Sequence, residues 1–176
     1  ELSVNFILKC LYLMVPAYFA NMAPVIVKKI KLFEVPMDFD KKLSGQPIFG
    51  KNKTWRGFIF GIVFAIILAY LQYLLYNIGF FRSVSFIDYK NWLLFGFLIG
   101  LGALTGDLVK SFFKRRLGFK PGAAFIPFDQ LDFVVGALIF IMPIFDVSLK
   151  LFLVSLLLSF VLHITINHVA FFLKIR

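Results

Sequence analysis

One short segment between two apolar stretches gathers the side chains that could do chemistry. It spans 111–132 and reads SFFKRRLGFKPGAAFIPFDQLD. Five cations lie in it or just before it, namely Lys110, Lys114, Arg115, Arg116 and Lys120. Clustered Lys and Arg side chains bind phosphate oxygens, and the aspartates that close the segment supply the hard oxygens that Mg²⁺ prefers. Together these residue types indicate phosphate chemistry at a membrane surface.

The two aspartates, Asp129 and Asp132, are three residues apart, so on a helix both project from one face. They stand at the start of an apolar stretch, where ionisable groups are costly and usually functional. Acidic residues also favour helix N-termini without binding a metal. Two acids on one face beside a cationic segment favour a metal site, and we predict that they hold Mg²⁺.

A third acid, Asp107, follows Gly106 at the end of the preceding apolar stretch. It is expected either to join the metal site or to pair with a nearby cation such as Lys110 or Lys114. Ser111 lies one helical turn beyond Asp107, on the same face if the helix continues. Both residues are therefore candidates for the site.

A second cationic cluster, FGKNKTWRG, occupies 49–57. Its glycines allow close backbone approach, and its Lys and Arg side chains match phosphate oxygens. It does not fit the GxxxxGK[ST] pattern, so a P-loop kinase is not expected. A solvated loop beside a membrane is the alternative. The residues predicted to contact substrate phosphates are Gly50, Lys51, Lys53, Thr54, Arg56 and Gly57, together with Lys114 and Arg115.

Composition indicates an integral membrane protein. The chain has 176 residues, of which 61% are hydrophobic and 25 are Phe, and its mean hydropathy is +0.91. The formal charge of +10 sits in short stretches beside apolar segments. Phosphates of lipids or nucleotides are therefore expected as partners, and nucleic acid is not.

Five apolar segments predict an all-α, multi-pass protein of the cell membrane with one domain over 1–176. The expected spans are 4–27, 57–81, 92–109, 129–145 and 148–173. Eight cations fall in the loop 28–56 and five in 110–120, which opens the loop 110–128. The positive-inside rule makes these loops and the C-terminus cytoplasmic, with the N-terminus outside and a cytoplasmic active site. A re-entrant fourth segment would instead put the C-terminus outside.

Small residues recur at GxxxG spacing in these segments, which lets helices approach closely. The pairs are Gly57 and Gly61, Gly96 and Gly100, and Gly102 and Gly106. Packing within the chain is the favoured interpretation, and a homodimer interface is the alternative. In the last segment, His163 and Asn167 share a helical face. Hydrogen bonding between helices is favoured, and contact with a lipid headgroup or with the site is the alternative.

These residues, in their order, are similar to the signature of the phosphatidate cytidylyltransferase family. The matching positions are Gly106-Asp107, Ser111, Lys114-Arg115, Lys120 and Asp129-x-x-Asp132. Pro121 stands where that family has Asp, its GHGG segment is missing, and Gln130 replaces Arg. Those departures, with Pro36-Met37-Asp38 and the 49–57 cluster, resemble the archaeal branch, the CDP-archaeol synthases. Asp40 stands where that branch is expected to have Gly.

The resemblance implies a reaction of CTP with an archaeal ether-lipid phosphate, giving a CDP-lipid and pyrophosphate. It implies Mg²⁺ at Asp129 and Asp132, with Asp107 as a further ligand. The catalytic residues it implies are Asp107, Ser111, Lys114, Arg115 and Lys120.

Other functions remain open at this point. An enzyme that acts on ester-linked phosphatidate would share the motif. A small transporter would need charges along a midplane path, whereas here they concentrate at one interface. A CDP-alcohol phosphotransferase would carry D-G-x-x-A-R, which is absent. A non-catalytic scaffold would leave the clustered acids and bases unexplained.

Overall fold

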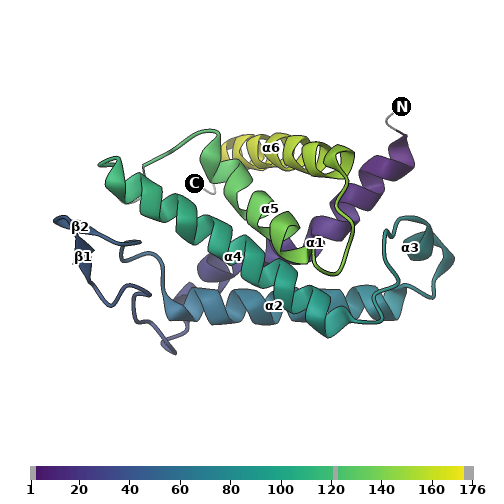
Figure 1. The fold of residues 1–176 in the computed structure, drawn as a ribbon, viewed down its shortest axis with the longest axis horizontal. Helices are drawn as coiled ribbons and strands as arrows, with labels where there is room; N and C mark the ends of the chain where they lie inside the picture. The colour runs from purple at the N-terminus through teal and green to yellow at the C-terminus, as the bar shows by residue number, and fades with distance from the viewer. Residues whose placement is uncertain (1–2, 121–122, 173–176) are drawn as a thin grey trace.

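The computed structural model describes residues 3–120 and 123–172, which form a helical bundle with one short hairpin (Figure 1). The helices are α1 (Val4–Ile26), the 3-10 turn η1 (Val27–Lys29), α2 (Trp55–Leu75), α3 (Gly79–Ser83), α4 (Trp92–Arg116), α5 (Phe128–Ile141) and α6 (Leu149–Phe172). The strands β1 (Lys42–Leu43) and β2 (Gln46–Pro47) pair antiparallel. The all-α prediction is thus confirmed apart from this hairpin.

Local sequence sets where the first two long helices begin. The Ser3 hydroxyl accepts the amide of Phe6 at 3.2 Å, and the Thr54 hydroxyl accepts the amide of Gly57 at 3.3 Å. Each hydroxyl satisfies an amide that the helix cannot pair internally. Long apolar runs then carry both helices for five turns or more.

Within the described residues, four helices are long and apolar enough to cross a membrane, namely α1 with η1, α2, α4 and α6. The protein is therefore a multi-pass membrane protein. The predicted span 129–145 forms α5, whose 14 residues extend only about 21 Å at 1.5 Å per residue. That is shorter than the hydrocarbon core of about 30 Å, so five full spans stay a prediction.

The predicted loop 110–128 is wrong in its first part, because α4 continues to Arg116. Its last two turns carry Lys110, Ser111, Lys114 and Arg115, so these side chains have fixed helical directions. Long cationic side chains are good helix formers, and their apolar stems pack while their heads reach polar groups. The helix ends near Gly118, which has a positive φ of 78°.

Helix α4 forms the centre of the bundle and packs against α1, α2 and α5. Small residues make this possible. A Cβ on Gly96 would lie 2.9 Å from Ala69 Cβ on α2, and one on Gly102 would lie 2.7 Å from Phe140 Cβ on α5. Each of the six glycines at GxxxG spacing meets a neighbouring helix of the same chain. The preference for packing within the chain is confirmed, and a homodimer stays a prediction.

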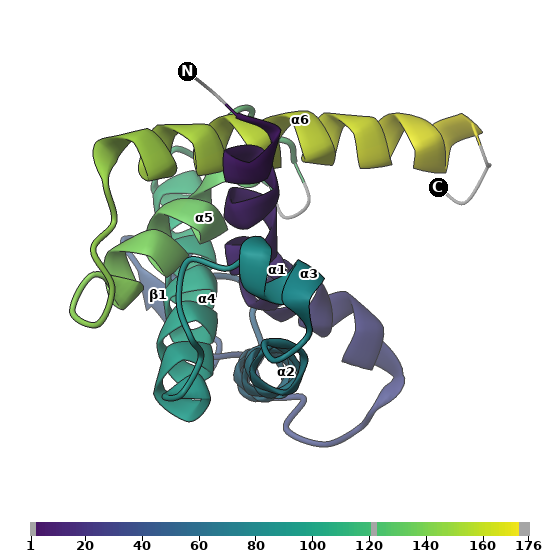
Figure 2. The same cartoon turned by 90° about the vertical axis from the view of Figure 1, so that its right-hand side faces the viewer.

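Helix α6 packs on α5 and α1. It runs across them, and its C-terminal half extends beyond the rest of the bundle (Figure 2). At the opposite edge, the β1–β2 hairpin lies beyond the N-terminal end of α2 (Figure 1). The loop that carries this hairpin returns to the bundle at 49–54, next to the cationic end of α4.

Candidate active site

A polar cavity of about 430 Å³ lies between the loop before α2, the end of α4 and the segment that leads into α5. The loop contributes Gly50, Lys51 and Lys53, and α4 contributes Ser111, Lys114 and Arg115. The two cationic clusters of the sequence therefore face one space. Seven of the predicted site residues, these six and Asp129, meet there although they are up to 79 positions apart in the chain.

The three predicted metal ligands surround a lysine of α4. Lys110 Nζ lies 3.1 Å from an oxygen of Asp107, one turn earlier on the same helix. It lies 2.9 Å from Asp129 Oδ1 and 2.9 Å from Asp132 Oδ2 on α5. The Lys110 side chain is only 13% exposed. Three carboxylates thus converge on one cationic position at the boundary between α4 and α5.

Three carboxylates in this arrangement would suit a bound metal cation, but here the ammonium of Lys110 supplies the positive charge between them. Carboxylate oxygens are the hard ligands that Mg²⁺ requires, and three of them share this position. No group of three or more His, Cys, Asp or Glu side chains within residues 3–120 and 123–172 has the geometry of a metal site. The donor set fits a divalent ion only if Lys110 leaves the space between the acids.

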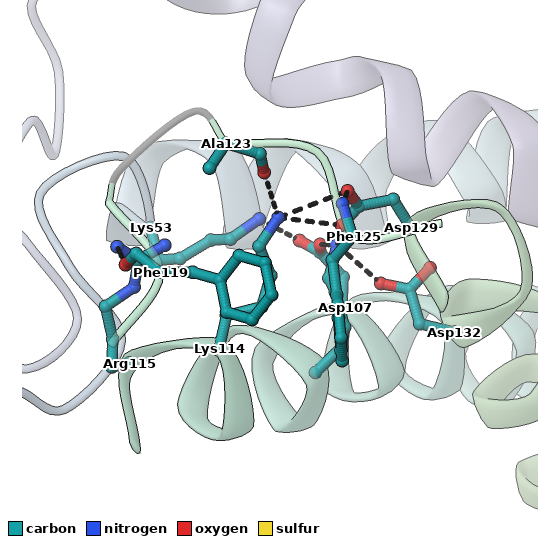
Figure 3. Close-up of polar contacts among 10 residues, drawn as sticks. Lys53, Asp107, Lys114, Arg115, Phe119, Ala123, Phe125, Asp129 and Asp132 are labelled. Carbon is teal, nitrogen blue, oxygen red and sulfur yellow. Dashed lines mark hydrogen bonds and ion pairs between the residues drawn. The ribbon is translucent and has the colours of Figure 1, made fainter. Parts of the chain in front are cut away.

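Lys114 ties the segment before α5 to α4 (Figure 3). Its ammonium donates to the Ala123 carbonyl at 2.5 Å and to the two oxygens of Asp129 at 3.0 and 3.1 Å. Asp129 also accepts the amide of Phe125 at 2.6 Å. A lysine predicted to hold phosphate therefore has a half-buried carboxylate as its partner in this state.

A further ion pair connects the two cationic clusters. Lys53 in the loop before α2 donates to Asp107 on α4 (Figure 3). Asp107 thus receives one lysine from its own helix and one from the loop. This dual contact fits both alternatives for Asp107, since it is paired with cations and also belongs to the acidic cluster.

Arg115 and Ser111 are buried at the wall of the cavity. The Arg115 guanidinium donates to the Phe119 carbonyl at 2.6 Å, which folds the chain back after α4. Its stem lies beside Gly50, where a Cβ would sit 3.9 Å from Arg115 Cδ. Arg115 therefore supports the loop and presents a positive charge to the cavity.

Four predicted site residues lie elsewhere. Thr54 caps α2, and Gly57 packs against Pro24 of α1. Arg56 is buried and donates to the Ile30 carbonyl at 2.5 Å, so it holds the end of η1. Lys120 is exposed and does not line the cavity.

Several residues outside the predicted site also line the cavity, among them Asn52, Lys110, Gln130 and His163. Gln130 is buried, and its Oε1 has no hydrogen-bond partner among the described residues. The sequence signal that could have identified Gln130 is its position between Asp129 and Asp132, two acids at helical spacing. His163 lies on α6 and lines the cavity. The favoured interpretation, hydrogen bonding between helices, did not predict this position. The side chain of Asn167 lies outside the described residues.

An apolar groove of about 660 Å³ adjoins the acidic cluster between α4 and α5. Its walls include Val109, Phe113, Leu131 and Ile139, and its polar end reaches Lys110 and Asp132. The polar cavity also reaches Lys110. Water-soluble and apolar ligands could thus approach the same charged cluster from two sides.

The membrane helices and the cationic cavity define a multi-pass membrane protein with a site suited to phosphate groups. Comparisons with known proteins name its family. The family model for CarS-like proteins, CDP-archaeol synthase, matches residues 3–176. The chain is 36% identical over 169 residues to the CDP-archaeol synthase of Pyrococcus furiosus, covering 96% of this chain and 95% of the relative. It is 33% identical over 179 residues to that of Archaeoglobus fulgidus, covering 98% and 97%.

A solved structure described as an intramembrane enzyme for archaeal membrane lipid biosynthesis has a similar fold. Its TM-score is 0.70 at 28% identity, over 92% of this chain and 94% of that one. The chain belongs to the CDP-archaeol synthase family. It is therefore an enzyme, and the transporter and scaffold interpretations are set aside.

Proposed function

We propose that this protein transfers CMP from CTP to an archaeal ether-lipid phosphate, 2,3-di-O-geranylgeranylglyceryl phosphate. An oxygen of the lipid phosphate attacks the α-phosphorus of CTP. The bond between that phosphorus and the oxygen that bridges it to the β-phosphate breaks. CDP-archaeol and pyrophosphate leave. Family membership supports the cytidylyl transfer, and the resemblance of the motif to the archaeal branch supports the ether-linked substrate.

One observation carries the proposal, namely that the polar cavity and the apolar groove both end at Lys110. Each substrate has one part that suits one of these spaces. The triphosphate of CTP suits the cationic cavity, and an isoprenoid chain suits the groove between α4 and α5. Binding in this way would bring the lipid phosphate and the α-phosphate to the same cluster, which is the positioning that such transfers need.

The lysines of the site would exchange their partners when CTP binds. Lys110 and Lys114 now pair with Asp129 at 2.9 and 3.0 Å. Phosphate oxygens compete well for these ammonium groups because they carry more charge. Lys51, Lys53 and Arg115 would add charge along the triphosphate and the departing pyrophosphate. A lipid phosphate monoester is already anionic near neutral pH, so no strong general base is required.

The same exchange would release three carboxylates for Mg²⁺. Asp129 and Asp132, with Asp107, would hold the ion, which would supply charge stabilisation at the phosphates. The chain's own contribution is to keep these oxygens on two packed helices. Mg²⁺ dependence and the roles of these three residues are part of the proposal.

The proposal keeps the predicted topology. Five membrane crossings, with the bilayer thinned around the short α5, would put the loop 28–56 and the segment 110–128 on the cytoplasmic side, where CTP is available. Labelling single cysteines at Lys51 and at Lys90 from outside tests this orientation. Reagent that reaches position 90 only would support it, and reagent that reaches position 51 only would reverse it.

Isotope position tests the reaction class. Purified protein is incubated with lipid phosphate and with CTP labelled at either the α- or the γ-phosphate. Transfer of CMP predicts α-label in the lipid and γ-label in pyrophosphate. Appearance of γ-label in the lipid would indicate a kinase and would contradict the proposal.

A further inference from the structure

Asp38 lies in the loop between α1 and α2, and only 5% of it is exposed. Its carboxylate accepts three backbone amides. Oδ2 accepts those of Phe49 and Gly50, each at 2.9 Å, and Oδ1 accepts that of Asp40 at 3.1 Å. The salt bridges of the described residues include none to Asp38. Backbone amides are thus the main partners of this buried carboxylate.

Burial alone would raise the pKa of Asp38, but hydrogen bonds from Gly50, Phe49 and Asp40 outweigh it and lower that pKa. The side chain is therefore an anion at neutral pH. Amide bonds to an anion are about twice as strong as those between neutral groups. They join two parts of the loop that are 12 positions apart.

Other backbone bonds hold the far end of the same segment. The Met37 amide donates to the Lys53 carbonyl at 2.7 Å, and the Lys53 amide donates to the Gly50 carbonyl at 3.0 Å. Residues 50–53 therefore form a tight turn fixed to 37–38 at both ends. Lys51 and Lys53 line the polar cavity from this turn.

Gly50 makes the turn possible because its φ is +96°, a conformation that side chains disfavour. It also lies against the Arg115 side chain, at the wall of the cavity. A shift of the Gly50 backbone would therefore move Lys51 and Lys53 relative to α4. The two amide bonds to Asp38 oppose this shift directly at Phe49 and Gly50.

We propose that Asp38 is the positioning residue of the nucleotide-binding loop. Its carboxylate fixes the backbone at Phe49 and Gly50 so that Lys51 and Lys53 face the triphosphate of CTP. Asp38 does not line the polar cavity and acts through the loop. This inference rests on the proposed function for its substrate, while the fixing of the backbone stands without it.

The test is Asp38→Asn with Asp40→Asn as the matched control. An Asn side chain keeps the shape but turns an NH₂ toward at least one of the three amide donors. Asp40 is exposed, its carboxylate accepts none of the hydrogen bonds described above, and its replacement makes the same charge change. We expect Asp38→Asn to raise the KM for CTP by about tenfold or more and to leave the KM for lipid phosphate unchanged. Asp40→Asn should change neither.

Hydrogen exchange measured without substrates gives a second readout. Amides of residues 48–53 should exchange about tenfold faster in Asp38→Asn than in the wild type, and Asp40→Asn should leave them protected. Asp38→Ala, which removes every side-chain acceptor, should exchange at least as fast as Asp38→Asn.

Equal CTP KM values for Asp38→Asn and Asp40→Asn, or a parallel rise in both KM values, would overturn the inference. So would failure of both Asp38 variants to fold while Asp40→Asn folds, because that marks a general structural role. If the wild type does not use CTP, the proposed function fails. Faster exchange at 48–53 in Asp38→Asn alone would then still support the fixing of this loop.

Discussion

Gly106 on α4 lies directly against the backbone carbonyl of Asp132 on α5, and a side-chain carbon on Gly106 would collide with that oxygen. This contact sets the distance between the helix that carries the lysines and the helix that carries two of the acids. Only a residue without a Cβ permits it. The acidic cluster around Lys110 therefore depends on a glycine that has no chemical role.

Gly106→Ala should push α5 away from α4. We expect a loss of about 1–3 kcal/mol in the free energy of unfolding and a larger fractional loss of turnover, because Asp132 moves with its helix. Thermal unfolding in detergent and turnover at saturating substrates measure the two effects. Gly79→Ala is the control, since no atom lies within 4 Å of the Cβ it would add. A Gly106→Ala enzyme with normal stability and rate would refute the role of this contact.

Asp132→Asn and Asp129→Asn should each lower turnover by at least about 100-fold while the protein still inserts and folds. Each change removes one hard anionic oxygen from the proposed Mg²⁺ site. Turnover is measured over a range of Mg²⁺ concentrations. Asp146→Asn is the control, because that acid is exposed and lies beyond the C-terminal end of α5, whereas Asp129 and Asp132 lie near its N-terminal end. Full activity in either variant would remove the metal proposal.

Lys114→Ala should weaken CTP binding by about 10- to 100-fold, the value of one charge-assisted contact to phosphate. It also removes the ammonium that joins the Ala123 carbonyl to Asp129, so the segment before α5 should become more mobile. Isothermal titration with CTP measures the affinity. Lys28→Ala, at an exposed position in η1, should bind CTP normally. Unchanged affinity in Lys114→Ala would reassign that lysine to a purely structural role.

Arg56→Ala should lower stability by about 1–3 kcal/mol, because the Ile30 carbonyl loses a charged donor. The KM for CTP should stay the same, although the sequence cluster 49–57 predicted that Arg56 binds the nucleotide. Unfolding and steady-state kinetics separate the two outcomes. A CTP-selective rise in KM with normal stability would return Arg56 to the nucleotide site.

Apolar length predicted α1 well, since this helix begins and ends within one residue of the expected span, and α6 begins one residue after its expected start. It was wrong at the end of α2, which stops at Leu75 and not at 81. It failed at the cationic end of α4, where hydropathy stops at Val109 but the helix continues. The reason is physical, because Lys and Arg leave the helix intact and only change what surrounds it. Hydropathy reports the environment of a helix and not its end.

The sequence also identified the charged residues of the site but not how they pair. Spacing placed Asp129 and Asp132 on one face of a helix, yet it contained no information that Lys110 would lie between them. That contact depends on the packing of α4 against α5 at Gly106. Similarly, Asp38 was part of a motif, and only the folded loop reveals the amides that it accepts.

The most direct test of the account is a turnover assay with labelled CTP and two lipid phosphates, one ether-linked and isoprenoid, the other ester-linked and acyl. Each is measured with Mg²⁺ and after chelation. We predict CDP-lipid with the ether substrate, a lower rate with the ester, and no product after chelation. Preference for the ester lipid, or equal product without a divalent ion, would contradict the account.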